Sequence, residues 1–497
     1  MSTPITTSWV LALAPEIALV VLLVLVLIYS RVWEAEQRRV GLLTAWGGLA
    51  ILGITFGLWY FFNEPNPQAS LTESVIWGGM IRHDLVTLVF RVMFFASLIL
   101  VSLISADVKY LQKGEFYALL IMATIGFSLM AASVDLIMVY IALETASISS
   151  YVLAGFLSNQ KRSTEAGMKY FVYGAFATGI MLYGMSWLYG LTGHTNLYII
   201  GDMLMGVPLQ ANAEFNVILL AAVMVLVGFG FKIAIVPFHF WTPDIYEGAP
   251  TSVTAFVSTA SKAAGFAILL RVFLSGSLGL PSFANSWWSL LVVMSIVTMV
   301  LGNFAAIYQT NIKRMLAYSS IAQAGYVLIG LIVLTPEGAG AAMFYLLMYV
   351  FTNIAAFGVV IAVSNVTHSD EMTDLYGLSR RSPNLALVML FALLSLGGIP
   401  PTAGFFGKFF LFKAAVDVGL WWLAMIGILN AFVALYYYLN VVKYMYLFRS
   451  DEDEKPIPVS RAAAIGLGVS TFFVIFLGVY AGPAFEWTLA AASAFFP

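Results

Sequence analysis

Five ionisable side chains interrupt long apolar stretches of this sequence. Glu144 lies in the stretch YIALETAS, with about ten apolar or small residues on each side. The other four are lysines, Lys169, Lys232, Lys262 and Lys408. A charge near the middle of a bilayer costs about 2.5–3.5 kcal/mol even on lenient scales, so each of these residues requires a partner, water or a role. Because four cations accompany one anion, ion pairing alone does not account for the set.

Buried lysines of this kind suit proton movement. Desolvation and neighbouring cations both favour the neutral form of a lysine, which can then gain and lose a proton near neutral pH. Glu144 would hold the proton on a nearby lysine or release it, according to the distance between them. His239, two residues after Pro237, is either a proton relay or a cap over carbonyls that the proline leaves free. The structural alternatives are polar contacts between helices and, for Lys169, snorkelling to the membrane surface.

The sequence does not predict a cofactor site in this chain. There is no cysteine for an iron–sulfur cluster, a disulfide or a thiolate zinc site, and the four histidines lie far apart. The glycines of GFG at 228–230 are followed by Ile233, where the dinucleotide fingerprint needs a third glycine, and Gly407-Lys408 lacks the other residues of a phosphate loop. A net charge of −2 gives no reason to expect nucleic acid.

The elements that position these residues are predicted to be membrane helices. Of 497 residues, 61% are hydrophobic and 10% are charged, and the mean hydropathy is +0.93. Apolar runs of about 20 residues, the length that crosses a bilayer, recur along the whole chain. The prediction is an all-α polytopic membrane protein with about fourteen transmembrane helices. They are expected at about 9–30, 40–62, 84–105, 115–132, 134–157, 166–190, 215–241, 251–274, 286–308, 313–334, 339–364, 384–413, 418–447 and 460–482.

Loop charges predict the orientation in the cell membrane. Loops after odd-numbered helices carry nearly all the basic residues: Arg31, Arg38, Arg39, Lys109, Lys113, Lys161, Arg162, Lys313, Arg314, Arg380, Arg381, Arg449, Lys455 and Arg461. The opposite loops, at 63–67, 193–196 and 335–338, carry almost none. The positive-inside rule therefore places both termini on the non-cytoplasmic side. Asp135, Arg91 and the run Arg82–Asp84 are expected to anchor helix ends.

An internal repeat is the predicted domain organisation. The run YVLAG at 151–155 returns as YVLIG at 326–330, and each half contains a Gly- and Pro-rich interruption, at 228–237 and at 397–408. Interrupted helices at corresponding places in two halves indicate a transport site. We expect helices 1–3 over residues 1–110, two inverted five-helix repeats over 111–280 and 281–450, and helix 14 within 451–497.

Two longer motifs carry a family resemblance. Residues 228–250 read GFGFKIAIVPFHFWTPDIYEGAP, and residues 311–322 read NIKRMLAYSSIA. Both resemble the hallmarks of the antiporter-like membrane subunits of respiratory NADH-quinone oxidoreductase, complex I. Within that family, the sequence at 244–248 and 322–326 and the lysine at Lys408 are most similar to those of subunit N, also called subunit 2. Subunit M is less similar because it usually has a glutamate at the last place.

The resemblance implies functions for the buried charges. Glu144 and Lys232 would form a pair that tunes a first half-channel, and Lys408 would be the gate of a second. Lys169 and Lys262 would link the two along a central hydrated axis. The chain would translocate protons in a complex whose other subunits hold FMN and iron–sulfur clusters and pass electrons from NADH to quinone.

The resemblance also implies which subunits lie next to this chain, and other functions remain as alternatives. The neighbours would be K-like and M-like membrane-arm subunits. The nearest rival reading is a subunit of a multisubunit sodium/proton antiporter, which shares the lysines and the interrupted helices. A passive scaffold and a self-sufficient redox enzyme are further alternatives. The excess of buried cations argues against the scaffold, and the missing cysteines and nucleotide motifs argue against the redox enzyme.

Overall fold

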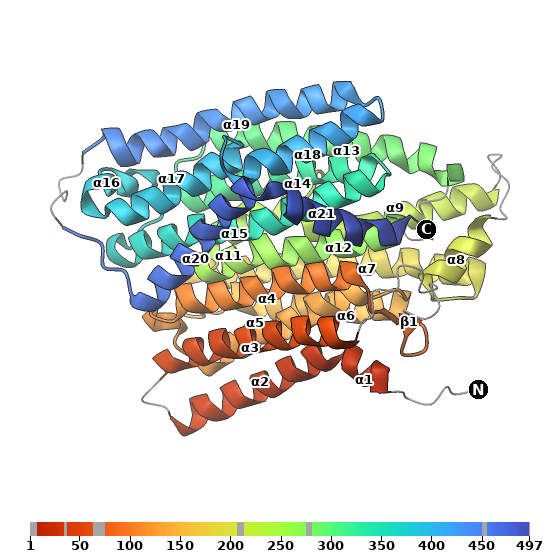
Figure 1. The fold of residues 1–497 in the computed structure, drawn as a ribbon, viewed down its shortest axis with the longest axis horizontal. Helices are drawn as coiled ribbons and strands as arrows, with labels where there is room; N and C mark the ends of the chain where they lie inside the picture. The colour runs from red at the N-terminus through yellow and green to blue at the C-terminus, as the bar shows by residue number, and fades with distance from the viewer. Residues whose placement is uncertain are drawn as a thin grey trace.

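The computed structural model describes residues 7–33, 37–62, 75–205, 213–274, 281–449 and 455–496, which form a bundle of long helices lying side by side (Figure 1). The N-terminal half contains α1 (Thr7–Ala12), α2 (Ala14–Val32), α3 (Arg38–Phe62), α4 (Leu85–Ser105), α5 (Gly114–Ala132), α6 (Leu136–Ala154), α7 (Lys161–Thr192), α8 (Leu197–Met205), α9 (Ala213–Ile233), α10 (Trp241–Gly248), α11 (Thr251–Phe256) and α12 (Lys262–Leu274). The C-terminal half contains α13 (Pro281–Ile307), α14 (Ile312–Ile332), α15 (Pro336–Thr367), α16 (Leu378–Arg381), α17 (Pro383–Gly397), α18 (Ala403–Asp417), α19 (Trp421–Leu447), α20 (Arg461–Val479) and α21 (Ala481–Ala492). Short elements complete it: β1 (Val75–Ile76) and β2 (Ile81–Arg82), which pair antiparallel, the 3-10 turns η2 (Lys109–Leu111), η4 (Met372–Leu375) and η5 (Ser493–Phe495), and the π-helical turn η3 (Val257–Ser261).

The predicted helical membrane architecture is confirmed. Thirteen helical stretches within the described ranges are long and apolar enough to cross a membrane, and each overlaps one of the predicted spans. The remaining predicted span, 384–413, is divided between α17 and α18. The sequence did not predict α8 or α21 as separate helices. The predicted loop at 63–67 lies outside the described residues.

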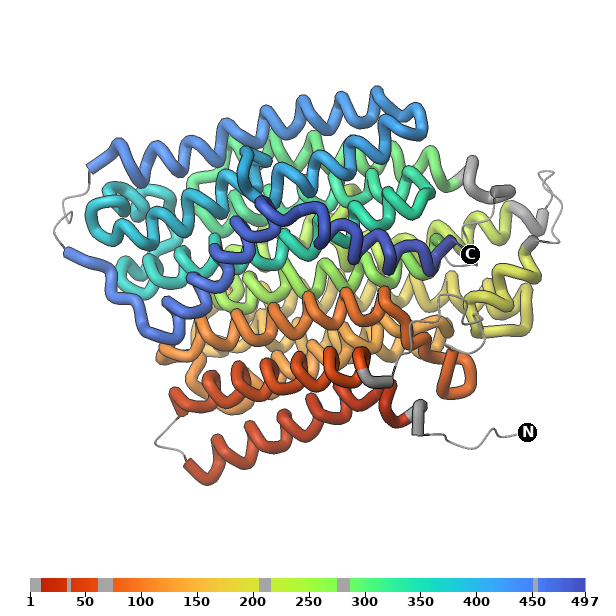
Figure 2. Tube along the Cα trace, viewed as in Figure 1, coloured from red at the N-terminus to blue at the C-terminus, as the bar shows by residue number. Residues whose placement is uncertain are grey.

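The chain crosses the bundle back and forth. The N-terminal helices α2 and α3 form one edge and α19 the opposite edge (Figure 2). Between these edges α20 packs beside α4, although about 360 residues separate them along the sequence. Both α1 and the end of α21 lie at one end of the bundle, and α16 lies at the other (Figure 1).

Two long helices form the centre of the bundle. All of the apolar window of α15 is buried, and so is that of the continuous segment Thr251–Leu274, which joins α11, η3 and α12. Around α15 pack α4, α14, α17, α18, α20 and α21. A charged side chain on either central helix is therefore surrounded by protein and does not face lipid.

Both predicted interruptions are present. Helix α9 ends at Ile233, where Ala234 has a φ of 61° and Pro237 follows. Helix α17 ends at Gly397, where Gly398 has a φ of 86° and two prolines precede α18. A left-handed residue stops the regular hydrogen-bond ladder, and proline cannot donate to restart it, so both helices break inside the bundle.

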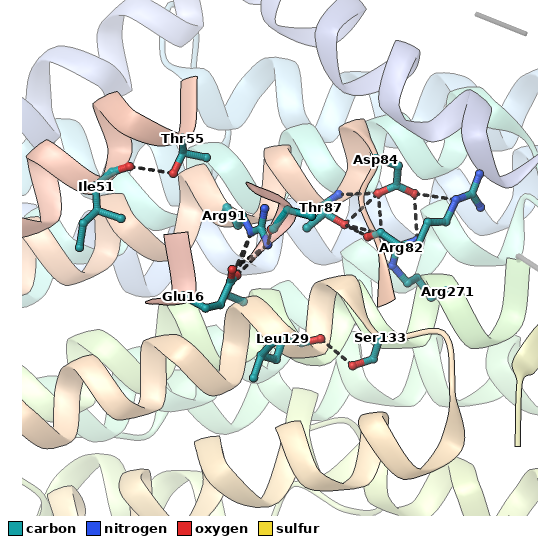
Figure 3. A network of polar contacts seen from close by, with 12 residues as sticks. Glu16, Ile51, Thr55, Arg82, Asp84, Thr87, Arg91, Leu129, Ser133 and Arg271 are labelled. Carbon is teal, nitrogen blue, oxygen red and sulfur yellow. Dashed lines mark hydrogen bonds and ion pairs between the residues drawn. The ribbon is translucent and has the colours of Figure 1, made fainter. Parts of the chain in front are cut away.

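Buried ion pairs that the sequence did not predict hold the N-terminal helices (Figure 3). Arg91 is 1% exposed, and its Nη2 lies 2.8 Å from Oε1 of Glu16 on α2. Arg91 was expected to anchor a helix end, and this is wrong, because it lies in the second turn of α4 and faces α2. Arg271, at the far end of α12, forms two bonds with Asp84, of 3.0 and 2.7 Å. Asp84 caps α4 as expected, accepting from the amide of Thr87.

Candidate functional site

The first buried cation lies just before the break in α9. Lys232 is 2% exposed, and its Nζ donates to the hydroxyl of Ser147 on α6 over 3.0 Å. It also lies 5.6 Å from the centre of the Phe127 ring. Glu144 is one turn before Ser147 on the same helix face and is half-buried, and its Oε1 has no hydrogen-bond partner. The predicted pair thus lies together, with Ser147 as the side chain that actually holds the ammonium.

The second cation, Lys262, begins α12 directly after the π-helical turn η3. It is 2% exposed, and its ammonium donates to both the backbone carbonyl and the hydroxyl of Ser320 on α14. The stem of Lys232 packs against the same helix, because a methyl group added at Gly265 would lie 3.2 Å from its Cγ. Gly265 is one turn beyond Lys262, so the fold brings these two lysines to neighbouring positions. A π-helical turn often marks a functional position within a helix.

The side chain of the third cation, Lys408, extends across the second helix break, from α18 to the end of α17. Lys408 lies in α18, is 4% exposed, and its Nζ donates to the carbonyls of Leu396 and Gly397 over 2.8 and 3.0 Å. Those carbonyls are at the C-terminal end of α17, where the helix dipole and the unpaired oxygens favour a cation. The ring of Tyr326 lies 5.0 Å from the same ammonium. Gly398 leaves room for this arrangement, since a methyl group there would lie 3.0 Å from Cδ of the lysine.

Polar side chains that the sequence did not predict as site residues lie between the second lysine and the third. Ser319, next to Ser320, shares a hydrogen bond with the hydroxyl of Tyr438 on α19. The amide of Gln323 donates to that hydroxyl over 3.1 Å and to the Leu396 carbonyl, which Lys408 also uses, over 3.2 Å. The available signal was the presence of polar residues in the middle of apolar helices, which requires burial against partners.

Two predicted site residues lie apart from this line. His239 lies in the break after α9, is 4% exposed, and its Nδ1 has no hydrogen-bond partner. Lys169 is not among the buried lysines: its side chain is 38% exposed, and its Nζ forms ion pairs of 2.7 and 2.8 Å with Asp244 and Glu165. It belongs to a pocket of about 240 Å³ lined by Arg162, Glu165, Ala166, Lys169, Asp244, Glu247, Gly248 and Arg314.

The charges of that pocket are paired with one another. Arg314 contacts Asp244 and Glu247 over 3.0 and 2.9 Å. Burial raises the pKa of Asp244, but the hydrogen bonds and charges of Lys169 and Arg314 outweigh it and lower the pKa of that carboxyl below its usual value. The cluster is therefore a solvated ion-pair network, and Lys169 has the environment of a structural surface cation.

The buried lysines have a different environment. In the described part of the chain, no carboxylate lies within ion-pair distance of Lys232, Lys262 or Lys408, and each ammonium is held by neutral oxygens. Neutral acceptors leave a lysine able to lose its proton without stranding a buried carboxylate. Among the same residues, no group of three or more His, Cys, Asp or Glu side chains is placed to hold a metal ion.

The chain is similar to known proteins in both sequence and structure. A family model described as NADH:quinone oxidoreductase/Mrp antiporter, TM, matches residues 133–434, which contain all the buried lysines. The NADH-quinone oxidoreductase subunit N of Moorella thermoacetica is 42% identical over 468 residues, covering 93% of this chain and 94% of that protein.

Solved structures give the same family likeness. A chain of respiratory complex I from Thermus thermophilus, with bound aureothin, is 31% identical with a TM-score of 0.76, covering 96% of this chain and 100% of that one. A chain of the Mrp complex from a Dietzia species has a TM-score of 0.77 at 21% identity, covering 99% and 98%. At that identity the second likeness shows the fold alone.

Proposed function

The chain belongs to the NADH:quinone oxidoreductase/Mrp antiporter transmembrane family, and we propose that Lys232, Lys262 and Lys408 carry the protons that it moves. It is a proton-translocating subunit of the membrane arm of an NADH-quinone oxidoreductase, assembled with the other membrane-arm subunits. The rival assignment to a multisubunit sodium/proton antiporter has less support, because the named relatives with high coverage are subunits N.

The observation that carries this proposal is the environment of the three ammonium groups. Each is at most 4% exposed and held by hydroxyl or carbonyl oxygens. A lysine whose role is structural is best stabilised by a carboxylate partner in ion-pair contact. A lysine that must take and release a proton needs partners that tolerate both of its states, and neutral oxygens do.

The proposed roles follow the order of the contacts. Glu144 acts on the Lys232 charge through space and tunes the first half-channel, within residues 111–280. Lys262 links the halves through Ser320. Lys408 controls the second half-channel, within 281–450, from the broken end of α17. The two units form the inverted pair of five-helix repeats, and each supplies one interrupted helix.

Two further assignments complete the proposal. His239, with a free ring nitrogen in the first break, is a relay group of the first half-channel. Lys169 acts in the surface ion-pair cluster, since its ammonium is already bound by two carboxylates. The chain holds no redox cofactor of its own, its neighbours are K-like and M-like subunits, and its termini lie on the non-cytoplasmic side.

Lys262→Met tests the function directly. Methionine keeps an unbranched side chain that is one atom shorter, and it removes the proton site. We expect the complex to assemble and the ΔpH formed by membrane vesicles per NADH oxidised to fall about tenfold. Lys413→Met is the matched control, because Lys413 is 57% exposed and pairs with Asp417 near the C-terminal end of α18. Wild-type ΔpH from an assembled Lys262→Met complex would contradict the proposal.

A further inference from the structure

Gln323 shares a hydrogen-bond acceptor with Lys408 and lies one turn after Ser320, which holds Lys262. It is in the middle of α14 and is 1% exposed. Its Nε2 donates to the Leu396 carbonyl over 3.2 Å and to the Tyr438 hydroxyl over 3.1 Å. Its Oε1 accepts from the hydroxyl of Tyr345 on α15. The amide thus contacts α15, α17 and α19 at once, with both of its N–H groups in use.

The orientation of this amide is determined by its neighbours. A backbone carbonyl only accepts hydrogen bonds, so the group that faces Leu396 must be the NH₂ and not the oxygen. The oxygen then faces Tyr345, which donates to it. Because Tyr438 accepts from Gln323, its own hydrogen is available for Ser319. Both N–H groups of Gln323 therefore act as donors, one to the Leu396 carbonyl and one to the Tyr438 hydroxyl.

This direction prevents a proton from passing through the amide. Proton hopping requires each link to accept on one side and to donate on the other. The nitrogen of Gln323 donates on both sides, and an amide does not ionise near neutral pH. On the other side, the Lys408 ammonium donates to the same Leu396 carbonyl, which has no proton to pass on. Gln323 therefore separates Lys408, as a proton carrier, from Tyr438 and Ser319.

We propose that Gln323 is a positioning residue that keeps the Lys408 ammonium on the Leu396 carbonyl and insulates it from Tyr438 and from Ser319, the residue next to the Ser320 that holds Lys262. The inference rests on the proposed function of the two lysines. Proton transfer between Lys262 and Lys408 requires the Gln323 amide to break these hydrogen bonds and water to take its place. Gln323 then sets when the second half-channel connects with the first.

Gln323→Glu changes the chemistry of this link and keeps its shape. The protonated acid still donates one hydrogen bond, as the amide does. The carboxylate cannot donate to Leu396, and it attracts the Lys408 ammonium away from the end of α17. The titratable groups that face this position are Lys408 of α18, Tyr345 of α15, Tyr438 of α19 and Tyr326 of α14 itself. Free tyrosine ionises near pH 10. The group that the variant adds is the new carboxyl, whose protonation is expected to change between about pH 6 and pH 8 because burial raises the pKa of a carboxyl.

Gln323→Met is the structural comparison, since it fills the same space and forms none of the bonds. The measurement is ΔpH formed per NADH oxidised by vesicles that contain the whole complex, with assembly checked on native gels. At about pH 8 we expect the Glu variant to fall about fivefold below the Met variant, and the gap to close towards about pH 6. A structural role would affect the Met variant at least as much at every pH. Equal ratios for the two variants at pH 8 would overturn the inference.

Two further variants complete the test. Gln309→Glu is the matched control, because Gln309 is a half-buried glutamine whose Nε2 donates to a backbone carbonyl over 2.8 Å, away from the lysines. It should keep the wild-type ratio. Lys408→Met separates the two levels of the proposal: normal pumping by it would refute the function of Lys408 itself. If Lys408→Met fails to pump while Gln323→Glu and Gln323→Met give the same ΔpH per NADH oxidised, only the role of Gln323 would be refuted.

Discussion

Lys232 reaches Ser147 over 3.0 Å, and the carboxylate one turn away at Glu144 does not contact that ammonium. The charge of Glu144 therefore acts on Lys232 through space, and a hydroxyl holds the lysine in place. A direct ion pair would stabilise the charged lysine strongly and hinder proton release. The separation leaves the Lys232 ammonium without a carboxylate in contact among the residues that the structure describes.

Lys232→Arg should disable proton pumping while the complex still assembles. Arginine keeps the positive charge but does not release its proton at accessible pH. We expect the ΔpH formed per NADH oxidised to fall about tenfold or more in membrane vesicles. Lys413→Arg, on an exposed and ion-paired lysine, is the control and should leave that ratio unchanged. Normal pumping by an assembled Lys232→Arg complex would show that Lys232 is structural.

The effect of removing the Glu144 charge on proton pumping should depend on whether Lys232 is present. Glu144→Gln keeps the shape of the side chain and removes its charge, so it should reduce pumping by a smaller factor than Lys232→Ala. The double variant should be no worse than Lys232→Ala alone, as expected of residues that act as one unit. Additive losses in the same vesicle assay would indicate that the two residues act separately.

Lys169→Arg should be tolerated, in contrast to Lys232→Arg. The Lys169 ammonium serves two carboxylates at an exposed site, and a guanidinium can bind both. We expect the ratio of ΔpH to NADH oxidised to stay within about twofold of wild type, because an exposed ion pair contributes at most about 1 kcal/mol. A tenfold loss with intact assembly would return Lys169 to the proton path that the family resemblance assigned to it.

Asp84→Asn should destabilise the protein by about 3–5 kcal/mol, because it leaves the buried Arg271 without its carboxylate. Thermal unfolding of the purified complex in detergent measures this, and the amount of assembled complex should fall with it. The double variant Asp84→Asn with Arg271→Met should recover part of the loss. If the double variant is less stable than Asp84→Asn, Arg271 stabilises the fold through other contacts.

The same pair predicts a pH dependence. Burial raises the pKa of Asp84, but the charge and hydrogen bonds of Arg271, with Arg82, outweigh it and lower the pKa to about 2. A group with a lowered pKa stabilises the fold above its unfolded value of 3.8 and loses that contribution as the pH falls towards about 2. The contribution is about 2 kcal/mol at neutral pH. The stability difference between wild type and Asp84→Asn should therefore be constant from pH 5 upwards.

The orientation of the helices is open to a direct test. Reporter fusions after Arg39, Arg162 and Arg381 should report the cytoplasm, because the basic loops are retained there. Fusions near Asn196 and at the C-terminus should report the opposite side. Two fusions within the first group that report opposite sides would contradict the alternating helices as well as the orientation.

The sequence predicted the features that depend on neighbours along the chain. Hydropathy over about 20 residues is a local property, so the membrane spans were found at nearly the right bounds. The breaks at Ala234 and Gly398 were expected because proline and glycine act on the helix that contains them. The burial of Lys232, Lys262 and Lys408 followed from the same local hydropathy.

Only the tertiary structure decided which side chains meet. The Asp84–Arg271 pair joins residues 187 positions apart, and Gln323 contacts Leu396 from 73 positions away, so no local pattern indicates either contact. Lys169 shows the opposite case: its sequence surroundings resemble those of the buried lysines, yet α7 turns that face outward and Asp244 binds it. Hydropathy sets whether a residue enters the membrane. The packing of distant helices sets whether its charge meets a carboxylate, a neutral oxygen or solvent, and hence whether it can carry a proton.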